Sequence, residues 1–308
     1  MISRTDETIP DAIRNIQKDL TRHLSFGHTR EITVGRDYAE AGIGDLLDWM
    51  DKEPNFHISS FLTTAHGKAK DIAQLIPLYE QMPAEVLRKM TLQHIMFSTS
   101  VRDILISTYS KVGFATNYLS IRKEAIPSEN DKQEKWAGIQ GAALYQEDKM
   151  KGTLNVEDAR AIAWANGRLG KQAFSVTWDE GKSRASVLFN KLKATRKVKM
   201  TKKGPQFMIK LYASGNLIYK KDTKKRNDTE LTHLITKLLN SKIEEDLSSA
   251  ITMTKRVGAD ALKLGTLLEW KYPGYWKNIQ EDWSEYYKNQ SDIRIQTKVD
   301  VIYTTNQP

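Results

Sequence analysis

Histidine is the first residue type to consider, because its imidazole can bind a metal or transfer a proton near neutral pH. The chain has six, scattered from one end to the other: His23, His28, His57, His66, His94 and His233. None stands in a His-Glu-x-x-His pattern, which would place two imidazoles on one face of a helix. Turns, caps and partly buried polar positions account for them. We therefore predict no metal site and no catalytic histidine.

A glycine-bearing segment, Gly35 to Gly44, lies between a predicted strand and a predicted helix, where nucleotide-binding loops also occur. It lacks the Gly-Lys-Ser/Thr ending of a phosphate-binding loop. The acidic residues in and beside it, Asp37, Glu40 and Asp45, would repel a phosphate group. We expect a turn that leads into a helix, and no nucleotide or other cofactor.

Three adjacent carboxylates, Glu244, Glu245 and Asp246, fall on the outward face of a long predicted helix, beside Lys242. Acid–base catalysis would need a cleft that separates their pKa values, so a solvated helix face is the better interpretation. No Gly-x-Ser-x-Gly elbow occurs. The chain has no cysteine, which excludes disulfides, thiolate metal sites and a thiol nucleophile. These observations favour a non-enzymatic protein without catalytic residues.

The strongest chemical signal is a basic block from Lys182 to Arg226. It contains fifteen Lys or Arg and one acidic residue, Asp222, whereas the whole chain has a net charge of +9. The remainder is therefore net acidic. Apolar residues alternate with Lys and Arg in this block, which places the charges on one face of a sheet.

Two interpretations of this face remain open. It could attract anionic lipid headgroups or another polyanion, or it could be a solvated face that keeps strand edges from pairing. A nucleic-acid-binding module is the alternative function. However, Tyr212 and Tyr219 are too few for a base-stacking platform, so we expect no nucleic acid.

The first third of the chain alternates helical and strand patterns, which predicts an α/β domain over 1–112 with adjacent parallel strands. A further helix is predicted over 101–111. The earlier elements are a helix at 9–24, a strand at 31–35, a helix at 42–52, a strand at 56–64 and a helix at 67–76.

A small middle α+β unit is predicted over 113–171. It begins with a strand at 113–121, followed by a polar loop or linker at 127–135. A second strand at 136–145 turns back at Asp148-Lys149. A helix at 156–169 then ends at Gly170.

The remainder, 172–308, predicts an α+β domain, and the chain as a whole reads as a mixed α/β, multidomain protein. An antiparallel meander of about four strands is punctuated by Gly181, Gly204-Pro205 and Gly215-Asn216. Asp228-Thr229 caps a long helix that runs to Val257 and must lie across the sheet to bury its apolar stripe.

The last fifty residues carry a characteristic order of breaks and aromatics. Gly258 can take the left-handed conformation that ends a helix, and Pro273 forces a second break. Trp276 and Trp283 then recur on one face of a short helix, and Ile293 to Tyr303 alternates as a half-buried strand does.

That order resembles the C-terminal end of the spore germinant receptor C subunits, the Ger(x)C family of lipoproteins. The matching positions are Gly258, Ala259, Asp260, Gly265, Pro273, Trp276 and Trp283, followed by the final strand. A second match near the start comprises His28, Glu31 to Gly35, Ala39, Gly42-Ile43, Leu47-Asp48, Ala65 and Gly67 to Asp71.

The resemblance implies a lipid-anchored protein on the outer face of the spore inner membrane. There it would assemble with two membrane subunits, A and B, so that nutrient germinants trigger germination. Family members begin with a signal peptide and a lipid-modified cysteine, so we expect the present chain to be a soluble fragment, or one numbered from inside the precursor. No apolar run approaches the about 20 residues that cross a bilayer.

Overall fold

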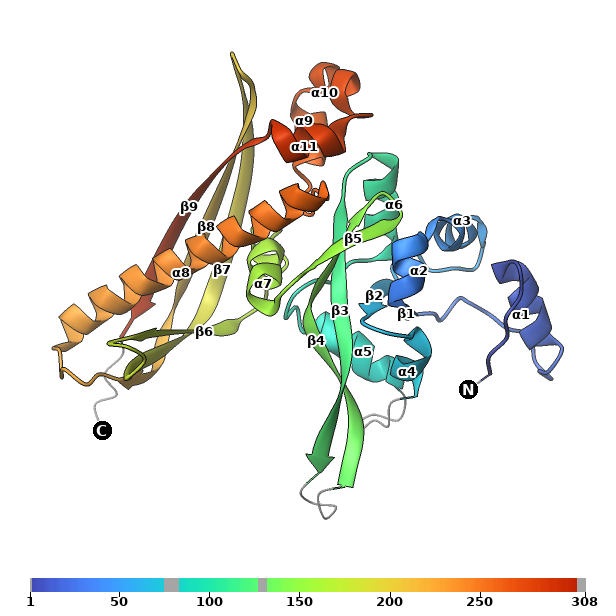
Figure 1. Cartoon of the computed structure of the whole chain (residues 1–308), viewed down its shortest axis with the longest axis horizontal. Helices are drawn as coiled ribbons and strands as arrows, with labels where there is room; N and C mark the ends of the chain where they lie inside the picture. Colours follow the sequence, from blue (N-terminus) through green and yellow to red (C-terminus); the bar gives the residue numbers. More distant parts are fainter. Residues whose placement is uncertain (1, 75–82, 127–131, 304–308) are drawn as a thin grey trace. The chain divides into compact units, whose positions relative to one another are not determined.

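The computed structural model describes residues 2–74, 83–126 and 132–303. The chain divides into two compact units (Figure 1): residues 1–93 with 97–156, and residues 94–96 with 157–308. Within the described residues, each unit is built on one β-sheet flanked by helices. This mixed α/β architecture confirms the predicted fold class.

The sheet of the first unit has the strand order β1-β2-β3-β4-β5. β1 pairs with β2 and β2 with β3 in parallel, which confirms the predicted adjacent parallel strands. β3 to β5 form antiparallel pairs and extend the same sheet. The strands are β1 (Glu31–Val34), β2 (Phe61–Ala65), β3 (Phe114–Ile126), β4 (Lys132–Gln146) and β5 (Lys149–Leu154). The three predicted domains, 1–112, 113–171 and 172–308, stay a prediction.

Helices cover both faces of this sheet. One face packs on α2 (Arg36–Ala41), α3 (Gly44–Lys52) and α6 (Val101–Tyr109), which contribute Ala39, Leu47 and Ile104 to its core. The other face packs on α4 (Ala69–Ala73) and α5 (Pro83–Leu92) through Ile72 and Leu87. Because side chains alternate along a strand, β1 presents Ile32 and Val34 to the first face and Glu31 and Thr33 to the second.

Several predicted boundaries in this unit were wrong by a few residues. The first helix, α1 (Ile9–Gln17), ends seven residues before the predicted Leu24, because the Gln17 side chain bonds Arg22 O and Leu24 N and closes a loop. The strand predicted from residue 56 begins at Phe61, after a turn held by the Ser60 hydroxyl.

The Gly35–Gly44 segment contains the short helix α2 rather than a simple turn. The helix predicted at 67–76 is α4, and its last two predicted residues lie outside the described ones. The predicted linker at 127–135 is partly wrong because residues 132–135 belong to β4; residues 127–131 also lie outside the described ones.

The sheet of the second unit has the order β6-β7-β8-β9. Its strands are β6 (Gln172–Trp178), β7 (Ser183–Thr201), β8 (Gly204–Lys221) and β9 (Asp292–Ile302). The predicted meander of about four strands is instead three antiparallel strands, and β9 joins β8 in parallel. Gly215 does not break β8 as predicted. It lets the strands approach closely, since a Cβ there would lie 2.2 Å from Leu188 O.

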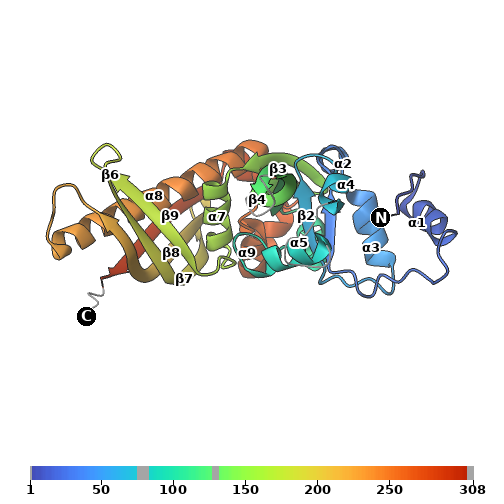
Figure 2. The same ribbon diagram turned by 90° about the horizontal axis from the view of Figure 1, so that it is seen from below.

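Two helices frame this sheet. The helix α7 (Val156–Ala165) ends four residues before the predicted Leu169, because Gly167 rather than Gly170 takes a positive φ of 70°. The long helix α8 (Asp228–Val257) is capped by Asn227, whose Oδ1 accepts from Glu230 N, and not by Asp228 as predicted. Figure 2 shows α8 extending along the sheet. Its buried residues are Leu231, Ile235, Leu239, Ile243, Leu247, Ala250, Ile251 and Thr254.

The C-terminal breaks fall where the sequence predicted them. Gly258 ends α8 with a φ of 71°, and Pro273 separates α9 (Leu264–Lys271) from α10 (Pro273–Ile279). The short helix predicted to carry both tryptophans is in fact two, because α11 (Trp283–Asn289) begins separately. Both indoles are buried, as predicted, with ring centroids 5.1 Å apart.

Candidate docking surface

The outer face of the second sheet carries five of the fifteen cations of the basic block. We call it the basic face and define it by exposed residues of β7, β8 and β9: Lys191, Lys193, Lys197, Lys199, Lys210, Arg294 and Lys298. The sequence predicted that alternation would place the charges of the block on one face, and the strand register confirms this for the five lysines of β7 and β8 named above. β9 adds two cations that lie far away in the sequence.

Cross-strand neighbours show how closely these charges lie. Lys193 pairs in register with Tyr212, which pairs with Lys298; Lys197 and Arg294 likewise flank Met208. Since neighbouring strands are about 4.8 Å apart, the backbones of such cations are separated by about 10 Å. Like charges at this spacing repel one another, and an anionic surface would relieve that repulsion.

The opposite face of the same strands is apolar and buried. Val198 of β7 and Phe207 of β8 pair in register, and Phe207 packs against Trp283 with ring centroids 6.3 Å apart. Arg196 is the exception to the predicted pattern, because it points inward. Its Nη1 donates to Asn166 Oδ1 at 2.7 Å and to Leu262 O, and burial lowers its pKa.

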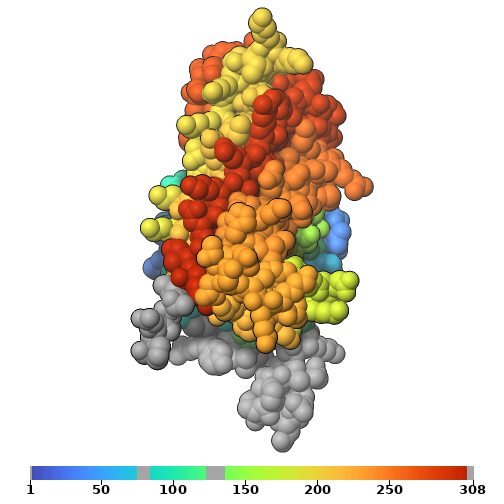
Figure 3. Space-filling view, turned by 90° about the vertical axis from the view of Figure 1, so that its left-hand side faces the viewer, coloured from blue at the N-terminus to red at the C-terminus, as the bar shows by residue number. Residues whose placement is uncertain are grey.

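Other cations of the basic block are engaged with acids. Lys182 lies 3.5 Å from Glu180, Lys220 lies 2.7 Å from Asp228, and Lys224 lies 3.1 Å from Asp179. Among residues 132–303, by contrast, the lysines of the basic face have no acidic partner within 4.0 Å. The lysines of the basic face therefore carry charge that no acid within residues 132–303 neutralises. Figure 3 shows β9 (red) at the surface between β8 (yellow) and α8 (orange).

The C-terminal motif residues support this sheet from inside. Asp260 is fully buried, and its Oδ2 accepts from Gly265 N at 2.8 Å. Burial raises the pKa of Asp260, while hydrogen bonds from the backbone and from Trp283 act in the opposite direction. The motif therefore builds the turn between α8 and α9 and offers no reacting group to solvent.

The six histidines do not come together. All of them are exposed, and the Nδ1 of His66 lies 2.9 Å from the Tyr118 hydroxyl. Within the residues that the structure describes, no group of three or more His, Asp or Glu is placed to hold a metal ion.

The glycine-bearing segment ends at a helix N-terminus that is already occupied. Asp148 Oδ2 accepts from Gly44 N at 3.2 Å, and Asp148 O accepts from Ile43 N. A Cβ on Gly42 would lie 2.7 Å from the same carboxylate. An acidic side chain therefore lies where a nucleotide phosphate would have to bind.

The carboxylates of α8 separate into two environments. Glu244 and Glu245 are exposed, as predicted for a solvated helix face. Asp246 lies 3.2 Å from Lys242, and burial raises its pKa against the effect of that lysine. No two of these carboxylates face each other across a cleft among the described residues.

Sequence reasoning missed one unusual side chain, Glu31, at the start of β1. Burial raises its pKa to about 8. The only signal was a glutamate at the first position of a short apolar strand, and alternation by itself would have placed it toward solvent. It is buried because helices cover both faces of the sheet.

Comparisons with known proteins agree with this architecture. The family model "Spore germination B3/GerAC like, C-terminal" matches residues 140–305, and "Spore germination protein N-terminal domain" matches residues 1–121. Among the described residues, no helix is both long and apolar enough to cross a lipid bilayer.

Relatives and a solved structure match over nearly the whole chain. The putative spore germination protein YfkR of Bacillus subtilis (strain 168) is 21% identical, covering 93% of this chain and 74% of its own length. Spore germination protein KC of the same organism is also 21% identical, and the match covers 94% of this chain and 75% of the length of that protein. The crystal structure of the GerBC protein has the same fold, with a TM-score of 0.69 and 16% identity over 93% of this chain and 82% of its own. The chain belongs to the GerAC-like spore germination family, that of the germinant receptor C subunits.

Proposed function

We propose that this chain is the non-enzymatic C subunit of a nutrient germinant receptor. It works at the outer face of the spore inner membrane, held there by a lipid on a cysteine outside these 308 residues. It assembles with the A and B membrane subunits, and the complex lets nutrient germinants trigger germination. The match of the C-terminal family model to residues 140–305 is the observation that carries this proposal.

The basic face supports a location against an anionic surface. Seven exposed cations lie on one sheet face, and the register places them in rows across three strands. Anionic headgroups attract each such cation near a bilayer by about 1 kcal/mol. We propose that this face lies against anionic lipid, which orients the subunit beside its membrane partners.

Deletion of the gene tests the receptor role. In a strain lacking the genes for other germinant receptors, deletion should abolish germination by nutrients, and the wild-type gene should restore it. Isolation of the protein from spore inner membranes should recover the A and B subunits with it. Unchanged nutrient germination in the deletion strain would exclude the role.

Vesicle sedimentation tests the basic face separately. The chain should bind vesicles of phosphatidylcholine with phosphatidylglycerol and not vesicles of phosphatidylcholine alone, and salt should weaken binding because it screens exposed charges beyond about 8 Å at physiological strength. Salt-insensitive binding would contradict the electrostatic account. A gel shift with duplex and single-stranded DNA covers the nucleic-acid alternative, which predicts a steep loss of affinity with salt.

A further inference from the structure

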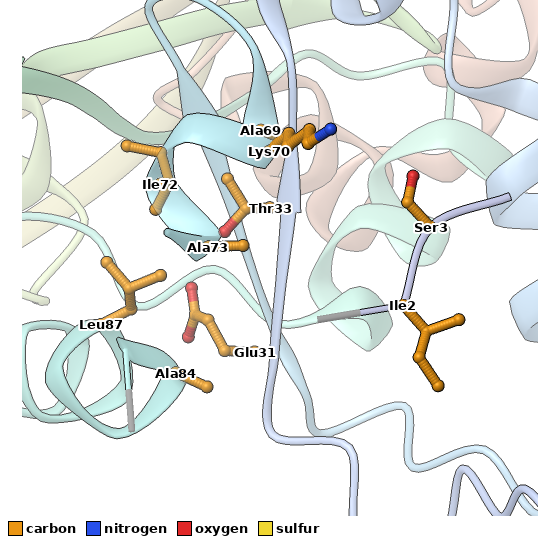
Figure 4. A pocket seen from close by; sticks show the side chains of 10 residues that line it. All are labelled: Ile2, Ser3, Glu31, Thr33, Ala69, Lys70, Ile72, Ala73, Ala84 and Leu87. Atoms are coloured by element: carbon orange, nitrogen blue, oxygen red, sulfur yellow. The ribbon is translucent and has the colours of Figure 1, made fainter. Parts of the chain in front are cut away.

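A cavity of about 660 Å³ lies in the first unit, between the sheet and the helices α4 and α5. Its volume falls within the range of sites that bind small molecules. Most of its lining is apolar, and Figure 4 shows the side chains involved. They are Ile2, Ser3, Glu31, Thr33, Ala69, Lys70, Ile72, Ala73, Ala84 and Leu87.

Glu31 is the one acidic side chain among these lining residues. Both of its carboxylate oxygens are buried, and neither has a hydrogen-bond partner in the part of the chain that the structure describes. Figure 4 shows the carboxylate among Ala73, Ala84 and Leu87. The Thr63 hydroxyl, which acts against burial in setting the pKa of Glu31, lies 3.1 Å from Thr33 Oγ1 and 3.4 Å from Ile32 O.

The charged groups on the neighbouring elements do not neutralise Glu31. On α5, Glu85 and Arg88 pair with each other at 2.8 Å, and Lys89 does not line the cavity. On α4, Asp71 also lies outside the lining, whereas Lys70 belongs to it. Figure 4 shows the Lys70 ammonium directed away from the Glu31 carboxylate.

The Glu31 carboxylate lowers the stability of the folded state. A buried carboxyl without partners is destabilising, and an apolar side chain of similar size would pack better among these neighbours. Buried titratable groups beside a cavity are typical of binding sites, where a ligand supplies the missing partner. A cation that carries hydrogen-bond donors would supply such a partner to Glu31.

Two classes of cation could pair with Glu31, and the lining distinguishes them. Calcium and magnesium need six or more oxygen ligands, and the cavity offers one carboxylate and the hydroxyls of Ser3 and Thr33. An alkylammonium ion needs one carboxylate for its charged end and apolar walls for its chain, which Ile72 and Leu87 provide.

We propose that this cavity binds a small aliphatic primary ammonium ion, with Glu31 as its counter-ion. A rotamer change turns the Glu31 carboxylate toward the cavity, where it accepts hydrogen bonds from the ammonium group while the alkyl chain packs on Ile72 and Leu87. The proposal concerns this chain alone and does not depend on receptor assembly.

NMR titration of the whole chain with n-butylammonium chloride tests the proposal. Saturable shifts are expected for the amides of Thr33, Ala69 and Leu87. The neutral analogue n-butanol lacks the charge, and the sodium ion of sodium chloride lacks the apolar chain. Each should therefore bind at least about tenfold more weakly than n-butylammonium. No saturable shift at these amides, or equal binding of n-butanol, would overturn the proposal.

Two variants test the carboxylate charge and the cavity volume separately. Glu31→Gln should weaken n-butylammonium binding by at least about tenfold while leaving n-butanol unaffected. Ala84→Leu keeps the carboxylate and fills the cavity, so it should weaken both. Glu244→Gln removes an exposed carboxylate of α8 and serves as the matched control, with unchanged affinity. Retained n-butylammonium affinity in Glu31→Gln would overturn the proposal.

The pH dependence gives an independent readout. Only the ionised carboxylate pairs with ammonium, and burial raises the pKa of Glu31 to about 8. The n-butylammonium ion keeps its proton to about pH 10, as a lysine does. Affinity should therefore rise about tenfold from about pH 7 to about pH 9 in the wild type and stay constant in Glu31→Gln. A flat wild-type profile would contradict pairing with Glu31.

Discussion

The indole Nε1 of Trp283 donates a hydrogen bond to Oδ2 of Asp260 across 3.1 Å. Both side chains are fully buried, and they join the start of α11 to the turn that follows α8. The same Trp283 ring packs against Trp276 and Phe207. One contact therefore links the C-terminal helices to the inner side of the sheet whose outer side is the basic face.

Removal of this hydrogen bond should destabilise the second unit. Trp283→Phe leaves the Asp260 carboxyl with one donor fewer and opens space beside Trp276, so the free energy of unfolding should fall by about 2 to 4 kcal/mol. Urea denaturation followed by circular dichroism measures the change. Trp270→Phe is the matched control, because Trp270 is 80% exposed and should alter stability by less than about 0.5 kcal/mol. Equal effects of the two variants would contradict the role of the Asp260 contact.

Glu31→Gln should stabilise the chain in a pH-dependent way. Burial raises the pKa of Glu31 from 4.5 to about 8, so the folded state holds the proton more tightly than the unfolded state does. This tighter binding of the proton stabilises the folded wild-type chain fully below pH 4.5, and the stabilisation is lost as the pH rises to about 8.

The free energy of unfolding of Glu31→Gln should therefore exceed that of the wild type by an amount that grows over this range. The difference should reach at most about 5 kcal/mol and stay constant at higher pH. Urea denaturation from about pH 5 to about pH 9 measures it. Glu244→Gln should show no such trend, and a wild-type advantage at high pH would contradict the sign.

Neutralising the basic face should weaken binding to anionic vesicles. The triple variant Lys193→Gln, Lys197→Gln and Lys210→Gln removes charges without acidic partners, and affinity at low salt should fall by about a hundredfold. The control triple variant Lys182→Gln, Lys220→Gln and Lys224→Gln removes the same charge from ion-paired sites. Equal losses in the two variants would mean that net charge, not the basic face, drives binding.

Two glycines of β4 should respond differently to alanine. A Cβ on Gly141 would lie 1.9 Å from Leu154 O, and the residue has a φ of 142°, so Gly141→Ala should lower the free energy of unfolding by more than about 2 kcal/mol. A Cβ on Gly138 would meet nothing within 4 Å. Gly138→Ala should therefore be tolerated. The two values come from denaturant titration, and a tolerated Gly141→Ala would show that β4 and β5 can separate locally.

The sequence determined the features that depend on neighbouring residues. A glycine after an apolar helix and a proline without an N–H act locally, so Gly258 and Pro273 mark real helix ends. Alternation acts over a few residues as well, and it predicted that the lysines of β7 share one face. The buried tryptophans followed from their spacing.

Only the tertiary structure decided the features that depend on residues far away in the sequence, namely strand pairing and side-chain burial. β9 pairs in parallel with β8, which adds Arg294 and Lys298 to the basic face; no local pattern specifies that pairing. Gly215 continues a strand because β7 passes close to it, although a glycine before an asparagine usually indicates a turn. The carboxylate of Glu31 loses its contact with solvent only because α4 and α5 pack over its side of the sheet. Burial and pairing are properties of the folded neighbours, and a single strand does not encode them.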